Sequence, residues 1–158
     1  MAIHDPHGII VGNIEALYHP TPETLPFWEG CSHGQLWLPQ CCECRTVLHP
    51  FDSTCSVCLG PTRKWIQASG DGRMITWVIY RRLYNPAFTL PYVVALIALS
   101  EGPHIISNLV DCSEATIKAG MPVRIVFDQL TDRIVLPRFR PHSILLEADT
   151  YDHSRQIL

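Results

Sequence analysis

The sequence predicts a mainly β fold with one N-terminal helix, a small cysteine-bearing ribbon and a five-stranded barrel. Three observations predict it. Two Cys-x-x-Cys pairs, Cys41/Cys44 and Cys55/Cys58, stand ten residues apart. A helix-start pattern precedes them, and β-rich runs separated by turn residues follow them. We therefore expect a leader arm over residues 1–20, the helix and ribbon over 21–62, the barrel over 63–141 and a tail over 142–158.

The helix is predicted to begin at Thr21-Pro22-Glu23, which supply a hydroxyl N-cap, a proline at the first helical position and an acid in the first turn. Pro26 fits only near the beginning of a helix, because proline lacks the N–H that an interior position donates. The helix should end around Gly30 to Gly34. In the leader, Gly12 interrupts a weak apolar stripe, so we expect a disordered or partner-docking arm there.

The paired cysteines predict a metal site. Each pair can present two thiolates from one tight turn, and four soft, tetrahedrally placed sulfurs suit zinc, with iron as the alternative ion. Two disulfides or four buried free thiols are the other interpretations, but Cys-x-x-Cys disulfides close very small loops and would stabilise little. Four cysteines fill a tetrahedral site, so the zinc should be structural, and so small a module should need it to fold.

Short strands are predicted to carry this site. Gln35–Pro39 should lead to the first cysteine pair, with Leu36 and Leu38 on one face and Trp37 on the other. Val47–Pro50 is predicted to be its return strand. Together they make the knuckle–hairpin–knuckle arrangement of a zinc ribbon.

Long β-rich runs begin at Lys64. Glycines at Ser69-Gly70-Asp71-Gly72 would allow one long strand over residues 64–83 to bend sharply. The later strands are expected at Tyr92–Ser100, His104–Val110, Val123–Phe127 and Arg133–Phe139, with one or two helical turns at Ser113–Ala119. Five strands, with the helical turn between the third and fourth, describe a small closed Greek-key barrel of the OB type.

Composition and cysteine content bear on the compartment. No apolar run is long enough to span a bilayer, and Met1–Gly12 has no basic residue ahead of its short apolar run, which argues against a secretory signal. Seven cysteines without such a signal indicate a reducing cytosol, so we expect a cytoplasmic protein. The leftover Cys31, Cys42 and Cys112 are expected to be buried small apolar residues rather than catalytic thiols.

The residues show no catalytic constellation. The sequence has no Gly-rich phosphate loop, no His-Glu-x-x-His and no nucleophile elbow. None of the eight histidines pairs with another at ligand spacing. His49 could substitute as a ribbon ligand, and His104 stands at the start of a predicted strand. We expect the chain to be non-catalytic by itself.

Several short segments between about Pro22 and Pro141 follow one another in a distinctive order. They are Phe27–Gly30, Gly34–Cys41, the four paired cysteines, Ala68–Gly72, Pro91–Leu96, Glu101–Pro103, Ser107–Val110, Gly120–Val123 and Leu136–Phe139. In this order they resemble an acyl-CoA-associated family that joins a rubredoxin-like zinc ribbon to an OB-fold. Arg45 and Leu59 depart from the pattern, because such knuckles often carry glycine there.

The resemblance implies a role as the small subunit of a thiolase-type enzyme: a thiolase, an acyltransferase or an aldolase. In such hetero-oligomers the large subunit supplies the catalytic residues, and the small subunit braces it and helps to hold the CoA ester. CoA phosphates need cations. Arg81 and Arg82 end the first long strand and Arg138 and Arg140 end the last, so these four are the predicted CoA contacts, with solvated strand ends as the alternative. Tyr84, Phe88 and Tyr92 would lie at a binding edge of the barrel.

Charge is unevenly distributed. Residues 60–140 hold ten Lys/Arg against six Asp/Glu, whereas the whole chain carries a net charge of −3. The mildly basic centre suits an anionic ligand, although ordinary surface charge is an alternative. The rival function is a nucleic-acid-binding zinc-ribbon/OB-fold module. The net negative charge of the chain disfavours nucleic-acid binding, and so does the ribbon, which has a single basic residue, Arg45, between Gln40 and Gly60. A third possible class is a self-sufficient thioesterase or redox enzyme.

Overall fold

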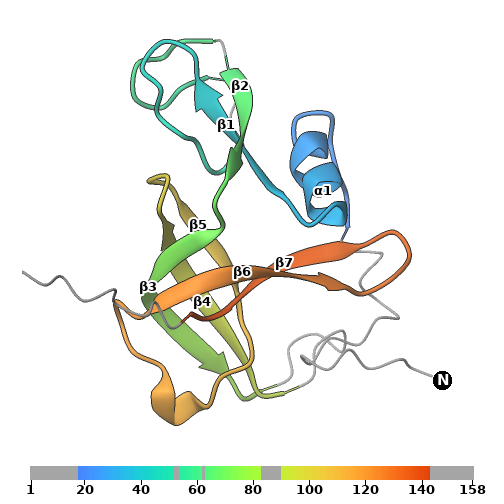
Figure 1. Ribbon diagram of the computed structural model, residues 1–158, viewed down its shortest axis with the longest axis vertical. Helices are drawn as coiled ribbons and strands as arrows, with labels where there is room; N and C mark the ends of the chain where they lie inside the picture. Colours follow the sequence, from blue (N-terminus) through green and yellow to red (C-terminus); the bar gives the residue numbers. More distant parts are fainter. Residues whose placement is uncertain (1–17, 52–53, 62, 83–89, 143–158) are drawn as a thin grey trace, which may run out of the picture.

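The computed structural model describes residues 18–51, 54–61, 63–82 and 90–142 (Figure 1). Its elements are α1 (Leu25–Ser32), β1 (Leu36–Cys41), β2 (Arg63–Ala68), β3 (Asp71–Tyr80), β4 (Tyr92–Leu99), β5 (His104–Leu109), the 3₁₀ turn η2 (Glu114–Thr116), β6 (Pro122–Gln129) and β7 (Val135–Pro141). Most of the predicted leader, the loop with Tyr84 and Phe88, and nearly all of the predicted tail lie outside the described residues.

The barrel is closed, with the strand order β3-β4-β5-β7-β6 and a return from β6 to β3. Its pairs are antiparallel except for β5 and β7, which run parallel where Leu109 meets Phe139. The turn η2 stands between the third and fourth barrel strands, with Ser113 as its N-cap residue. The predicted mainly β fold, with one helix and a five-stranded closed barrel, is confirmed.

The ribbon differs from the prediction in its strand pairing. We expected β1 to pair with a return strand at Val47–Pro50, but only one bridge forms there, between Gln40 and Val47. β1 instead pairs along its whole length with β2, from Leu36 opposite Ala68 to Cys41 opposite Arg63. Pro50 explains part of this difference, because it has no N–H to continue a ladder, whereas β2 contains no proline.

The expected long bent strand is divided between two sheets. Its first part is β2 in the small sheet, and its second part is β3 in the barrel. Gly70 makes the junction with φ +78°, and a Cβ there would lie 2.2 Å from Ile125 Cγ2 on β6. Only glycine fits this close approach, so the change of sheet occurs at that residue.

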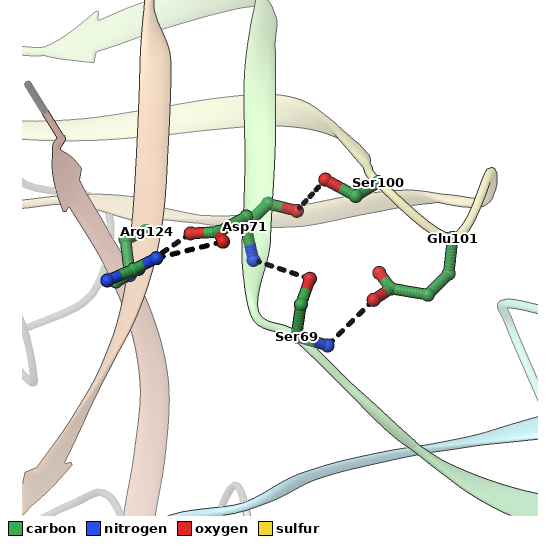
Figure 2. Close-up of polar contacts among 5 residues, drawn as sticks. All are labelled: Ser69, Asp71, Ser100, Glu101 and Arg124. Carbon is green, nitrogen blue, oxygen red and sulfur yellow. Dashed lines mark hydrogen bonds and ion pairs between the residues drawn. The ribbon is translucent and has the colours of Figure 1, made fainter. Parts of the chain in front are cut away.

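Polar contacts hold the junction (Figure 2). The Ser69 backbone N–H donates to Glu101 Oε1 at 2.7 Å, and the Asp71 N–H donates to Ser69 Oγ at 3.2 Å. Arg124 donates through Nε and Nη2 to the two carboxylate oxygens of Asp71, at 2.6 and 2.9 Å. Ser100 Oγ donates to the Asp71 carbonyl at 3.1 Å. The entry to the barrel is therefore tied to β6 and to the β4–β5 turn.

The helix begins one turn later than predicted. Thr24 is its N-cap residue and Pro26 stands within its first turn, while Thr21 opens a preceding turn whose carbonyl accepts from the Thr24 and Leu25 amides. The helix ends at Ser32, within the predicted range. Among the described residues, no helix has the length and apolar character needed to traverse a bilayer.

One continuous apolar core joins the helix, the small sheet and the barrel. Phe27 and Cys31 of α1, Leu36 and Leu38 of β1, and barrel residues such as Phe139 belong to the same buried cluster. The helix contacts β1 on one side and β6 and β7 on another, as Figure 1 shows. Cys41, Leu48 and Cys55 form a separate small cluster at the ribbon.

Candidate metal centre

Two knuckles of the same backbone design hold the paired cysteines. In the first, the Arg45 N–H donates to the Cys41 carbonyl at 3.1 Å, and the Cys41 N–H donates to the Thr46 carbonyl at 2.9 Å. In the second, the Leu59 N–H donates to the Cys55 carbonyl at 2.9 Å, and the Cys55 N–H donates to the Gly60 carbonyl at 3.0 Å. Each turn therefore aims two sulfurs at the same point.

Arg45 and Leu59, one in each knuckle, take a backbone conformation that glycine adopts more readily than other residues. Their φ angles are +61° and +60°, in the left-handed region. A side chain with a Cβ is strained there, because the Cβ approaches the backbone. The knuckle geometry is thus kept although both glycines are missing.

The four sulfurs converge. Their ligand atoms all lie within 4.8 Å of one another, with Cys41 Sγ 3.5 Å from Cys58 Sγ and Cys44 Sγ 3.6 Å from Cys55 Sγ. These distances are far above the length of a disulfide bond, about 2.0 Å. A tetrahedron with metal–sulfur bonds of about 2.3 Å has edges of about 3.8 Å. The four cysteines could therefore hold a metal ion.

Burial and charge fit such a site. Cys41 and Cys55 are buried, whereas Cys44 and Cys58 lie on the exposed side of the cluster. The Thr46 hydroxyl and backbone lower the pKa of the Cys44 thiol to about 6. The Gly60 amide acts to lower the pKa of Cys58, but the Cys41 and Cys44 thiols together raise it to about 12. Sulfurs this close repel one another when ionised, so a bound cation is needed to ionise all four.

The other cysteines stay apart from this cluster. Cys31 is 1% exposed within the core, and burial raises its pKa to about 12, so the expectation of a buried apolar residue is confirmed for it. Cys42 lies in the first knuckle but is exposed, so the expectation of burial is wrong there. Cys112 is half-buried, and burial raises its pKa. His49 packs edge-on against Phe51, and burial lowers its pKa.

The predicted arginines do not gather at one place. Arg81 and Arg82 are exposed beyond the end of β3, and Arg81 donates to the Glu114 carboxylate. Arg140 is exposed opposite Arg124, which itself pairs with Asp71 at the start of β3. These two positions stand at opposite ends of a strand of ten residues, about 30 Å long at 3.3 Å per residue.

Arg138 has a different environment. It is 1% exposed, and its Nη1 lies 3.1 Å from Asp128 Oδ2 on the neighbouring strand. A guanidinium paired inside the molecule cannot reach a phosphate in solution. Of the four predicted CoA contacts, only the other three present their side chains to solvent.

One feature of the site region had no signal in the sequence. A groove of about 300 Å³ runs between α1, the ribbon loop and the barrel. Its lining includes Phe27 and Trp28 from α1, His49 and Phe51 from the loop that joins β1 to β2 and carries the knuckles, and Ile106 from β5. These segments are far apart in the chain, so only the tertiary fold brings them together.

Comparison with known proteins places this architecture in a family. Residues 65–128 match the family model for the C-terminal OB-fold domain of ChsH2. A DUF35 domain-containing scaffold protein of Pyrococcus furiosus is 36% identical over 112 residues, which are 63% of this chain and 79% of that protein. The chain belongs to the DUF35 family.

Two further matches are to a longer protein and to one chain of a solved complex. A probable enoyl-CoA hydratase alpha subunit of Thermomonospora curvata is 34% identical over 116 residues, covering 73% of this chain but only 36% of that protein. A solved structure described as the Ltp2-ChsH2(DUF35) aldolase contains a chain that superimposes with a TM-score of 0.73 at 30% identity, covering 78% of this chain and 98% of that one.

Proposed function

We propose that this DUF35 chain is a zinc-containing accessory subunit of a thiolase-like acyl-CoA enzyme: a thiolase, an acyltransferase or an aldolase. It would brace the catalytic subunit and help to bind the acyl-CoA. The observation that carries the proposal is the structural match over 98% of a chain from the Ltp2-ChsH2(DUF35) aldolase. A relative described as a hydratase alpha subunit supports the link to acyl-CoA chemistry.

The chemistry of the described residues supports an accessory role. A site that four cysteines fill leaves no open position for a reactive water. The thiols outside it are poor nucleophiles where burial raises their pKa, as at Cys31 and Cys112. We therefore assign the nucleophile and the base to the partner, which would form a hetero-oligomer with this chain.

Zinc is the ion that this donor set suits best. Four thiolates in a tetrahedron favour zinc among common ions, with iron as the alternative, and Cys41, Cys44, Cys55 and Cys58 would hold it. When bound, the ion would supply the positive charge that allows the clustered thiols to ionise together. Its role here is structural.

For CoA, the exposed arginines are the candidate contacts. We propose that Arg81 and Arg82 donate to CoA phosphates where the barrel meets the partner, since the two residues are neighbours in the chain and both are exposed. Glu114 neutralises part of the Arg81 charge and holds its side chain near the surface of η2. Arg140 lies on β7 near the opposite end of β3, so it would contact CoA only if the ligand reached that end.

The test is reconstitution. The chain is co-expressed with a thiolase-like protein, and the purified assembly is examined by light scattering, metal analysis and acyl-CoA turnover. We expect a hetero-oligomer with turnover that neither component shows alone. Robust turnover by this chain alone, or salt-sensitive binding of single-stranded DNA in place of complex formation, would contradict the proposal.

A further inference from the structure

The two knuckles share a backbone but present different side chains to solvent. The first carries Cys42, Glu43 and Arg45 at its surface. The second carries Val57 and Leu59, which are 67% and 75% exposed and flank Cys58. An exposed valine and leucine two residues apart on one tight turn form an apolar knob, which we call the second-knuckle knob.

Leu59 is unfavourable in the isolated chain. Its φ of +60° lies in the left-handed region, where glycine would fit without strain. A strained residue usually persists because its side chain gains contacts, but Leu59 is 75% exposed and gains little burial from the described part of the chain. Arg45 has the same φ and is also exposed, but its charged side chain is stable in water. Leu59 is apolar and stands beside the exposed Val57, so its strain and exposure indicate that the leucine contacts something outside this chain.

The knob is held rigidly. The Leu59 N–H donates to the Cys55 carbonyl at 2.9 Å, and the Gly60 carbonyl accepts from the Cys55 N–H at 3.0 Å. Cys58, between the two apolar residues, belongs to the sulfur cluster. A side chain fixed before binding loses little conformational freedom when it is buried. The knob is therefore suited to fill a pocket of fixed shape.

The surroundings of the knob identify the kind of partner. Glu43 Oε2 lies 4.0 Å from Cys58 Sγ, and its carboxylate packs beside the Gly60 backbone, so the base of the knob is acidic. A membrane surface or a nucleic acid would instead favour basic residues around the contact. A convex tip also cannot enclose a small molecule. Both knuckles lie at the end of the small sheet that is remote from the barrel, where a second protein can approach (Figure 1).

We propose that the second-knuckle knob inserts into an apolar pocket of the catalytic subunit, at a rim that lacks carboxylates. This inference rests on the proposed function, because that function supplies the partner. Val57 and Leu59 would be central residues of the interface, and the metal would act in assembly by fixing their position. The first knuckle would remain at the periphery or in solvent.

The chain offers a matched control, since Arg45 occupies the same backbone position in the first knuckle as Leu59 in the second. Leu59→Gly and Arg45→Gly both relieve the same strain. We expect both variants to keep full metal content and to unfold at the same or a higher temperature than the parent chain. Binding to the separately purified thiolase-like subunit is then measured by calorimetry. We expect Leu59→Gly to raise Kd at least about tenfold and Arg45→Gly to change it less than about twofold.

A second variant guards against a local folding defect. Leu59→Asn keeps a residue that tolerates positive φ but removes the apolar side chain, and it should weaken binding as Leu59→Gly does. Equal Kd values for the parent, Leu59→Gly and Leu59→Asn would overturn the inference while leaving the proposed function intact. Loss of a homodimer or of vesicle binding in the Leu59 variants, with partner binding unchanged, would overturn it too. Failure of the parent chain to bind the subunit would overturn the proposed function, and this inference with it.

Discussion

At the scale of single residues, burial and neighbours decide which side chains can meet a ligand. The four paired cysteines have sulfurs that face one another, whereas Cys42, between two of them in sequence, points to solvent. Arg138 and Arg140 are two residues apart on β7, yet one is buried beside Asp128 and the other is exposed. The type of a residue therefore shows only that it could bind a ligand. Its burial and its neighbours determine whether the side chain can reach that ligand.

Metal content is expected to depend on the clustered cysteines alone. Cys58→Ser should reduce the bound zinc from about one ion per chain to well below half, because three sulfurs cannot complete the tetrahedron. Cys42→Ser in the first knuckle is the matched control and should keep the metal. Mass-spectrometric metal analysis of the purified proteins measures both. Equal zinc in the two variants would contradict the assigned ligand set.

The exposed arginines beyond β3 are expected to act on CoA affinity. Arg81→Ala/Arg82→Ala should raise the KM of the reconstituted enzyme for its acyl-CoA about threefold to tenfold, since charge-assisted bonds to phosphate are lost. The rise should be smaller at high salt, which screens exposed charges. Arg45→Ala/Arg133→Ala removes the same charge from exposed positions elsewhere and should leave KM unchanged. A parallel rise in both double variants would indicate a general charge effect.

The sequence predicted the convergence of the four paired cysteines better than the surroundings of the arginines, for a physical reason. Cys-x-x-Cys spacing is a local constraint, because one tight turn brings both sulfurs together whatever surrounds it. The position of an arginine on a barrel depends on what covers its strand. Arg138 is 1% exposed and lies beside Asp128 of the neighbouring strand, and no local pattern in the sequence reveals that burial.

At the scale of elements, the residue pattern predicted where the strands lie but not which strands pair with each other. Alternation in β1 and the apolar run of β4 predicted strands where they occur. The pairing of β1 with β2 joins segments separated by the whole loop that carries the cysteine knuckles. Periodicity carries no information about such long-range partners. The same limit explains why residues 64–83 appeared to be one strand rather than two.

The junction between the two sheets should be intolerant of any side chain at Gly70. Gly70→Ala combines positive φ with a clash against Ile125 Cγ2 and should cost about 2–4 kcal/mol of unfolding free energy. Gly120→Ala is a matched control, because its φ of +77° is nearly the same but no atom lies within 4 Å of the new Cβ. It should cost only about 1 kcal/mol. Urea denaturation of both variants measures the difference, and equal costs would exclude the clash.

The Asp71–Arg124 pair at the same junction should make stability depend on pH. Hydrogen bonds from Arg124 lower the pKa of Asp71 below its ordinary 3.8. A carboxyl whose folded pKa is depressed stabilises the fold above its unfolded pKa, and the contribution is lost as pH falls through the folded value. Asp71→Asn should therefore lower the unfolding free energy slightly at pH 7, because the pair is exposed.

Thermal melts across pH test this assignment. The difference between the parent chain and Asp71→Asn should be constant between about pH 5 and 8 and should shrink below about pH 4. Asp132→Asn, in the exposed turn between β6 and β7, is the comparison that should show little change at any pH. A deficit for Asp71→Asn that persists in acid would point to lost packing rather than lost charge.

At the scale of the whole molecule, the apolar core stabilises the helix, the small sheet and the barrel, whereas the two knuckles lie outside it. The helix, both strands of the small sheet and the barrel share one apolar cluster, to which Leu36, Ala68 and Ile97 belong. The knuckles contribute only the small cluster of Cys41, Leu48 and Cys55. So little apolar area cannot hold the knuckles without a metal. The remainder of the molecule has a core of its own.

Removal of the metal should therefore unfold the knuckles and leave the barrel folded. A chelator that strips the ion should release the amides of Cys41, Arg45, Cys55 and Leu59 to fast hydrogen exchange, because their hydrogen bonds belong to the turns that the ion would fix. Amides of β3 to β7 should exchange as slowly as before, since they lie around the shared core. Exchange measured by mass spectrometry resolves the two regions, with Cys42→Ser as a metal-loaded control. Loss of protection throughout the chain would mean that the metal stabilises the whole fold. A local loss, accompanied by loss of binding to the catalytic subunit, would show that the metal serves the ribbon and, through the second-knuckle knob, the assembly.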